Sequence, residues 1–168
     1  MTDRSFEPIR REDLARIAAI ARADREDLFD RNPELGSAYR DRVLIVALCQ
    51  GAALHFLDGR NGVKDFDVWT FFKNNPSRQF PARRNGHRDF SDPRFGVSTD
   101  RPDFRGRRVD LIGRSIPWRS GQTAVEAVQN YLRSSKAESP RLLVQKAVIV
   151  LEPENEMGTI IWPLSGAG

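Results

Sequence analysis

The sequence predicts an α/β (α+β) fold in which helices flank a mixed β-sheet, and three observations support this. The chain has 168 residues, the length of one domain with a substantial core. Hydrophobic residues make up 39% of it and charged residues 30%, which is too apolar for a fully disordered chain. Apolar residues recur at helical spacing in some segments and at strand spacing in others. We therefore expect a single domain over residues 1–168.

The first half of the chain is expected to form two helices and two strands. Apolar residues at helical spacing predict a helix over residues 11–31, which Pro33 ends. Residues 42–49 form a continuous aliphatic run typical of a buried strand, although this run also allows a helix. A short helix is expected over 52–57 and a second strand over 64–72. The alternation of this strand places Phe66, Val68, Thr70 and Phe72 on one face and Asp65, Asp67, Trp69 and Phe71 on the other.

The second half is expected to add a third core strand and a C-terminal extension over residues 123–163. Residues 107–112 are predicted to be the third strand. Thr123 begins a helix, because Glu126 three residues later completes a capping box. The extension continues with a short helix from Ser139 and strands over 147–151 and 159–162.

The composition excludes several classes of protein. The longest apolar run, residues 43–49, is far shorter than the ~20 residues that a membrane helix needs. The amino terminus lacks the apolar stretch of a secretory signal. Cys49 is the only cysteine, so an internal disulfide is excluded. We expect a cytoplasmic protein that does not bind a membrane.

Positive charge is concentrated between residues 73 and 108. This segment contains ten basic residues, nine of them Arg, and four acids, so its net charge is +6. Since the whole chain carries +4, the remainder carries −2. Prolines and glycines in the segment predict a long irregular basic loop between the second and third core strands. Four phenylalanines in it, Phe80, Phe90, Phe95 and Phe104, argue against a fully solvated loop.

Three aspartates are the main candidates for chemistry. Asp65 and Asp67 are two residues apart on a predicted strand, so their carboxylates share a face about 7 Å apart. Asp110 lies within the apolar third strand. Carboxylates held together require a compensating cation, and oxygen ligands prefer Mg²⁺ or Mn²⁺. Acids on two neighbouring strands can hold two metals ~3.5–4 Å apart for displacement at phosphorus, with Asp110 orienting or deprotonating the attacking hydroxyl.

Simpler interpretations of the same residues stay open. An Asp-x-Asp pair is commonly a solvated strand edge, and a lone Asp in an apolar strand is commonly an ion-pair partner, for which Arg107 and Arg108 are available. A glycine such as Gly51 is most often a turn or a helix start. His55 is expected to be a core histidine and His87 to be solvent-exposed.

The order of these motifs resembles the nucleotidyltransferase superfamily, the DNA polymerase beta-like fold. The residues that carry the resemblance are Gln50-Gly51-Ala52-Ala53, Lys64-Asp65-Phe66-Asp67-Val68 and Arg108-Val109-Asp110-Leu111-Ile112. It covers about residues 42–112. Ala52 stands where the family usually has Gly or Ser, which leaves phosphate binding to backbone N–H groups at the helix start.

The resemblance implies transfer of a nucleoside monophosphate from a nucleoside triphosphate such as ATP to a hydroxyl of a nucleic acid, protein or small molecule, with Mg²⁺ or Mn²⁺ as cofactor. The catalytic and metal-binding residues would be Asp65, Asp67 and Asp110. The nucleotide would be bound by Gly51, Ala52, Arg107 and Arg108. Phosphate or nucleic acid would be contacted by Arg83, Arg84 and Arg88. An alternative is a catalytically inactive module that binds nucleic acid or a protein through the Arg/Phe-rich loop. A third interpretation is a surface loop whose arginines pair with the acidic body and whose phenylalanines hold it in place.

Overall fold

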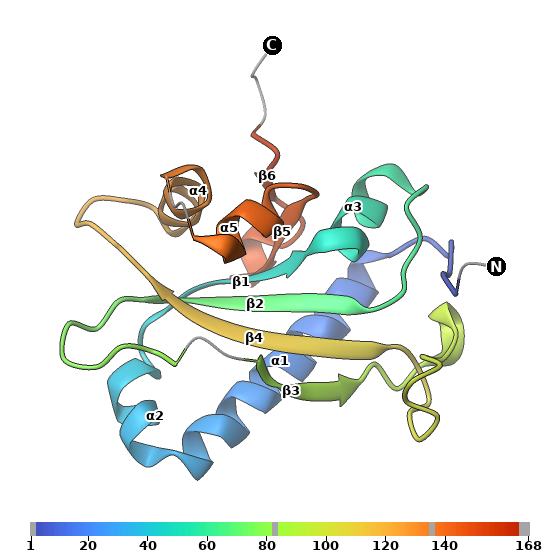
Figure 1. Cartoon of the computed structure of the whole chain (residues 1–168), viewed down its shortest axis with the longest axis horizontal. Coiled ribbons are helices and arrows are strands. Elements are labelled where there is room, and N and C mark those ends of the chain that lie inside the picture. Colours follow the sequence, from blue (N-terminus) through green and yellow to red (C-terminus); the bar gives the residue numbers. More distant parts are fainter. Residues whose placement is uncertain (1–2, 82–83, 135–136, 165–168) are drawn as a thin grey trace.

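A six-stranded mixed sheet forms the centre of the protein (Figure 1). The computed structural model of the chain describes residues 3–81, 84–134 and 137–164. The strands are β1 (Val43–Cys49), β2 (Phe66–Lys73), β3 (Arg84–Asp89), β4 (Arg108–Ile116), β5 (Val148–Glu152) and β6 (Ile160–Trp162). Their order is β3-β4-β2-β1-β5-β6, with β2 and β4 parallel and the other neighbours antiparallel. The predicted mixed sheet flanked by helices is confirmed.

Helices cover both faces of this sheet. The helices are α1 (Arg11–Arg31), α2 (Pro33–Tyr39), α3 (Gln50–Asp58), α4 (Ala124–Ser134) and α5 (Glu138–Leu143). The long helix α1 crosses one face, and α4 and α5 pack against the other (Figure 1). No helix among the described residues is both long and apolar enough to cross a membrane.

The alternation in β2 separates the two hydrophobic cores. Phe66 and Val68 pack in the core beneath α1, whereas Trp69 and Phe71 pack in the core beneath α4 and α5. This confirms the two faces predicted for the strand. Asp67 therefore extends from the face that carries Trp69, opposite α1.

The segment between β2 and β4 is more ordered than the sequence predicts. It contains the edge strand β3, which pairs antiparallel with β4, and a 3₁₀ turn, η1 (Pro93–Phe95). The expectation of a long irregular loop is therefore wrong for this part, and the predicted third strand becomes β4. β3 has no apolar alternation because its sequence, Arg-Asn-Gly-His-Arg-Asp, is polar throughout.

Three of the four phenylalanines of this segment anchor it to the body. Phe80, Phe90 and Phe95 are buried. The rings of Phe90 and Phe95 lie 5.0 and 5.4 Å from that of Phe66, centre to centre. Phe80 stacks on Phe72 at 4.5 Å. Aromatic packing thus orders the parts of the segment on either side of β3, which strand pairing does not hold.

Most of the remaining elements agree with the sequence, with one addition. The Thr123 hydroxyl accepts from the Glu126 N–H at 3.0 Å, and the Glu126 carboxylate accepts from the Thr123 N–H at 3.3 Å, so the predicted capping box is present. Pro33 ends α1 as expected, but it also occupies the first turn of α2, a helix the sequence did not suggest. Proline is tolerated there because the first N–H of a helix lacks an intrahelical partner.

Gly113→Ala should destabilise the protein, because the space beside β4 is filled. A Cβ at Gly113 would lie 2.5 Å from Cε1 of Phe80 and 2.8 Å from its Cζ. We expect the free energy of unfolding, measured by urea denaturation, to fall by about 1–3 kcal/mol. Gly86→Ala is the matched control, since among the described atoms its Cβ would meet Asp24 Oδ1 alone, at 3.8 Å. Equal stabilities of the two variants would contradict the packing of Phe80 against β4.

Candidate functional site

The three predicted aspartates gather where β2 and β4 begin. β2 and β4 are parallel neighbours, and Asp67 is the direct register partner of Asp110. Asp65 immediately precedes β2. Cys49, the last residue of β1, is the partner of Asp67 on the other side. The fold therefore brings together acids that are more than 40 positions apart in the sequence.

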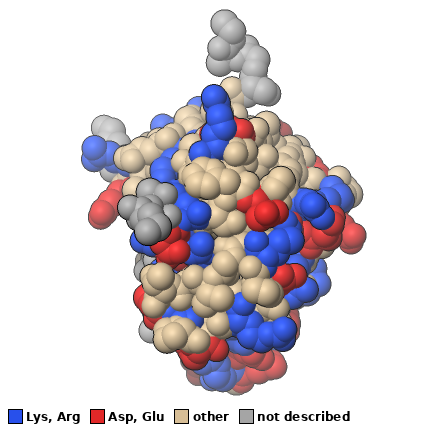
Figure 2. All heavy atoms as spheres, turned by 90° about the vertical axis from the view of Figure 1, so that its right-hand side faces the viewer, with Lys and Arg blue, Asp and Glu red and all other residues tan. Residues whose placement is uncertain are grey.

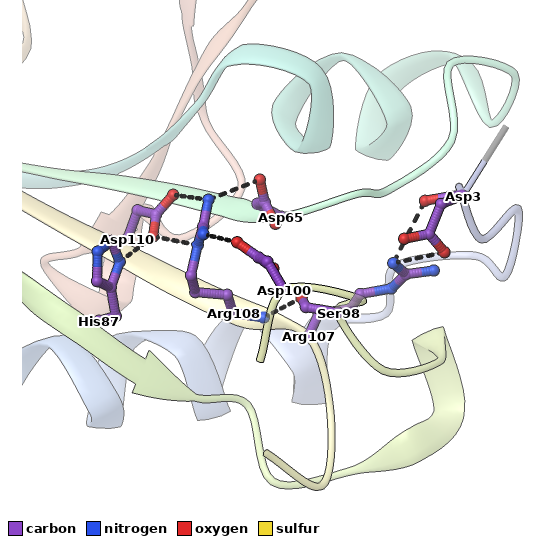
Figure 3. Close-up of polar contacts among 8 residues, drawn as sticks. All are labelled: Asp3, Asp65, His87, Ser98, Asp100, Arg107, Arg108 and Asp110. Carbon is purple, nitrogen blue, oxygen red and sulfur yellow. Dashed lines mark hydrogen bonds and ion pairs between the residues drawn. The ribbon is translucent and has the colours of Figure 1, made fainter. Parts of the chain in front are cut away.

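Arg108 connects two of these acids. Its Nε lies 2.8 Å from Oδ1 of Asp110, and its Nη2 lies 3.3 Å from Oδ2 of Asp65 and 3.3 Å from Oδ2 of Asp110. Asp100 also forms an ion pair with the same guanidinium (Figure 3). A side chain of this chain thus supplies the compensating cation that clustered carboxylates require.

Asp110 is the most deeply buried of the three acids. Only 2% of it is exposed, and its Oδ1 lies 2.6 Å from Nδ1 of His87, which comes from β3 (Figure 3). His87 is the register partner of Asp110, so the contact follows from the pairing of β3 with β4. The expectation for His87 was incomplete, because its side chain is 35% exposed but also holds a buried carboxylate.

The negative charge of the Asp65 carboxylate is only partly compensated. Partial burial raises the pKa of its carboxyl group, Arg108 opposes the rise, and Asp110 adds to it. The positive charge of Arg108 therefore does not fully offset the loss of hydration. A carboxylate in this condition would be stabilised by a further cation.

The start of α3 borders the acids. Gln50 has φ +63°, a left-handed conformation that is rare for a residue other than glycine. At Gly51 an added Cβ would lie 2.9 Å from Nδ2 of Asn61, which donates a hydrogen bond to the Gly51 carbonyl oxygen. A larger residue here would displace the Asn61 amide and disturb its hydrogen bond to the Gly51 carbonyl oxygen.

A pocket of about 180 Å³ lies between the start of α3 and the acids. It is lined by Arg4, Gln50, Gly51, Ala52, Lys64, Asp65, Asp67 and Lys146. Three cations and two carboxylates thus face the same space. The sequence analysis missed Arg4 and Lys146, since no motif marks them. Arg4 is positioned by the β-bridge between its neighbour Ser5 and Val63, and Lys146 lies in the turn before β5.

The predicted nucleotide-binding and phosphate-binding arginines separate into different places. Arg107 is 4% exposed, and its Nε donates to the carbonyl oxygen of Phe95 at 2.6 Å while its Nη1 pairs with Asp3 at 3.3 Å. Arg88 turns away from the acids and forms ion pairs with α1. Arg83 and the side chain of Arg84 lie outside the described residues.

Most positive charge of the segment 73–108 is neutralised within the described part of the fold. The ion pairs are Arg78 with Glu34, Arg88 with Asp24 and Asp27, Arg94 with Glu7 and Asp13, Arg101 with Asp103, Arg107 with Asp3, and Arg108 with Asp65, Asp100 and Asp110. Figure 2, viewed from the right of Figure 1, shows basic and acidic side chains interspersed. The contacts agree with the interpretation of a folded loop that pairs with the acidic body.

The donor set fits a hard divalent cation only in part. Asp65 and Asp67 offer carboxylate oxygens to one pocket, which suits Mg²⁺ or Mn²⁺. Asp110 is already engaged by Arg108 and His87. Among residues 3–81, 84–134 and 137–164, no group of three acidic, histidine or cysteine side chains is arranged to hold a metal ion. A third carboxylate ligand would thus require Arg108 to move.

Arg108→Gln should raise the pKa of Asp65 further above its usual value, because the guanidinium opposes the effect of burial on that carboxyl group. The measurement is an NMR titration of the side-chain carboxyl carbons. Arg101→Gln is the control, since Arg101 pairs with Asp103. An unchanged Asp65 titration in Arg108→Gln would mean that the two side chains are not in contact in solution.

Comparisons of this chain with protein-family models, curated proteins and solved structures find no match. Its relation to the nucleotidyltransferases thus stays a prediction from three short motifs. What the structure adds is their spatial arrangement: Gly51, Asp65 and Asp67 share a pocket, and Asp110 lies beside Asp67. Function has to be argued from that arrangement.

Proposed function

We propose that the protein is a metal-dependent nucleotidyltransferase that transfers a nucleoside monophosphate from a nucleoside triphosphate to a hydroxyl acceptor. One observation carries the proposal. The start of α3, two carboxylates and three cations line one pocket, while a third carboxylate lies on the neighbouring parallel strand. A triphosphate with its divalent ion needs cationic groups for the phosphates and carboxylates for the metal ion within one small pocket.

The phosphates would bind to the cationic side of the pocket. Arg4, Lys64 and Lys146 line it, and the first N–H groups of α3 have no intrahelical partners. Backbone N–H groups at a helix start suit phosphate oxygens, so Ala52 needs no hydroxyl to serve there. Gly51 leaves the space between two of these cations open, because a Cβ at this position would lie 3.7 Å from both Arg4 Nη1 and Lys146 Nζ.

Asp65 and Asp67 would hold the divalent ion. When bound, that ion would neutralise phosphate charge and lower the pKa of the attacking hydroxyl. Asp110 would orient the hydroxyl from the adjacent strand, and His87 fixes the direction of its carboxylate through the 2.6 Å contact. Arg108 would release Asp65 and Asp110 and turn towards the bound phosphates, for which its planar fork is suited.

Mg²⁺ or Mn²⁺ should raise the melting temperature of the protein, because a cation between Asp65 and Asp67 relieves their repulsion. Asp67→Asn should abolish this gain in thermal denaturation measurements. The matched control is Asp41→Asn, an exposed acid outside the pocket, which should keep it. The metal site is wrong if the wild-type protein shows no metal-dependent shift.

Transfer itself is tested with each α-labelled nucleoside triphosphate, Mg²⁺ and separate RNA, protein and small-molecule fractions. We expect label in one fraction and a loss of at least about 100-fold in Asp65→Asn and Asp67→Asn, since both carboxylates would hold the ion. Asp41→Asn is again the control. Labelling that survives both pocket substitutions would contradict the assigned site.

A catalytically inactive binding module is the second candidate, and Arg108 favours it. Its ion pairs with Asp65 and Asp110 compensate the acids without any metal. In that case metal would not change the melting temperature and no fraction would be labelled. The labelling experiment separates the two functions, because only the enzyme transfers a nucleoside monophosphate to an acceptor.

A further inference from the structure

A second and larger hollow lies at the opposite end of the sheet from the aspartates. Its volume is about 670 Å³, within the ~300–1,000 Å³ of pockets that hold small organic ligands. It is lined by Pro117, Arg119, Gln122, Ala127, Asn130, Tyr131, Arg133 and Ser134. Ile116, the last residue of β4, is six residues from Asp110, about 20 Å along an extended strand. The hollow is therefore separate from the pocket at the start of α3.

The hollow is formed between α4 and the connection that leads to it from β4. Figure 1 shows this connection arching outwards at the upper left before it returns to α4. Ala127, Asn130, Tyr131 and Ser134 line it from α4 at positions i, i+3, i+4 and i+7, which is one face of a helix. Gln122 shapes the opposite wall, because its Oε1 accepts from the backbone N–H of Arg119 at 3.0 Å.

The lining carries positive charge with no acidic residue. Arg119 and Arg133 are exposed, and neither forms an ion pair with any residue that the structure describes. Arg133 instead donates to Oδ1 of Asn130 at 2.8 Å, a neutral acceptor. This differs from the segment 73–108, where most described arginines have a carboxylate partner. Two unpaired guanidinium groups around one hollow favour a phosphate or carboxylate.

A third cation, Arg114, lies next to Tyr131 of the lining. Burial raises the pKa of Tyr131, and the adjacent Arg114 opposes that rise. Arg114 also has no ion pair among the described residues, and its buried Nε lacks a hydrogen-bond partner there. Arg114 thus adds a third cation next to a lining residue of the hollow, and no acidic residue that the structure describes lines the hollow.

Carboxamide groups lie in this hollow and in a neighbouring one. Gln122 and Asn130 line the hollow itself. A neighbouring hollow of about 280 Å³ shares Pro117 with it and is lined by Asn74, Asn75, Pro76, Gln79, Ser115 and Ile116. Amide side chains both donate and accept hydrogen bonds, which is the requirement for reading the polar edge of a nucleobase. The amide of Asn75 is already bonded to the Ala38 carbonyl oxygen and the Ser77 N–H, so Asn74 and Gln79 are the candidates in the neighbouring hollow.

We propose that the hollow beside α4 binds the phosphate of a nucleotide through Arg119 and Arg133, with the neighbouring carboxamides contacting its base. The volume far exceeds that of one phosphate, and the polar, uncharged groups next to the arginines match a base better than a simple anion. The nucleotide is either free or part of a single-stranded RNA, since both present the same phosphate and base. The site does not depend on the proposed enzymatic activity.

Isothermal titration calorimetry in EDTA tests this site with three probes: AMP, adenosine, and a short oligoribonucleotide with a 5′-phosphate. Without divalent ions, metal-assisted binding beside Asp65 and Asp67 is absent. We expect AMP to bind at least tenfold more tightly than adenosine. The double variant Arg119→Gln/Arg133→Gln should bind AMP and the oligonucleotide at least tenfold more weakly, and its unchanged melting temperature verifies folding.

Two control variants make the result specific. Arg141→Gln removes an exposed arginine of α5 outside the hollow and should leave affinity unchanged. Asp41→Asn, which removes an exposed acid outside both pockets, should also leave it unchanged. Because binding is measured in EDTA and read out by variants at Arg119 and Arg133, the result stays separate from a failure of the proposed transferase. Equal affinities for AMP and the oligonucleotide identify a mononucleotide site, and tighter binding of the oligonucleotide identifies a strand. No binding of any probe, equal binding of adenosine, or full affinity in the double variant would overturn the proposal.

Discussion

Compensation of negative charge where β2 and β4 begin is the interaction on which the rest of the site depends. Asp67 and Asp110 are register partners, and Asp110 is almost fully buried. An isolated buried carboxylate would be strongly unfavourable, so contacts from other elements are required. Arg108 from β4 and His87 from β3 supply them. The placement of the polar edge strand β3 and the compensation of the Asp110 carboxylate therefore depend on each other.

The same requirement explains why a segment rich in arginine folds against the body. Its phenylalanines provide apolar anchors, and its arginines meet carboxylates on α1, near the amino terminus and within the segment itself. An exposed pair such as Arg101 with Asp103 contributes little, about 0–1 kcal/mol. Asp13, Asp24 and Arg107 are buried, so their ion pairs chiefly prevent a buried charge from being left uncompensated. Burial of the aromatic rings supplies the apolar part of the stability. By contrast, Arg119 and Arg133 have no such partners, which distinguishes the hollow beside α4.

The sequence predicted those parts of the structure that depend on local pattern. The helix over 11–31, the two faces of β2 and the capping box at Thr123 follow from periodicity and spacing, and each is present. β3 was missed because an edge strand that is polar on both faces has no periodic signal. The contacts of His87, Arg4 and Lys146 were missed because they arise only when segments that are distant in the sequence come together in the fold. The three aspartates were identified from the sequence, but ion pairing with Arg108 was predicted only as the simpler alternative.

The central claim is that Asp65 and Asp67 form a divalent-cation site from which Arg108 can be displaced. Anomalous X-ray diffraction from crystals grown with Mn²⁺ and a non-hydrolysable nucleoside triphosphate tests it most directly. The account predicts an anomalous peak between the two carboxylates, phosphates at the start of α3, and the Arg108 guanidinium turned away from Asp110. An Arg108–Asp110 ion pair retained at saturating Mn²⁺, with no peak at Asp65 and Asp67, would contradict it.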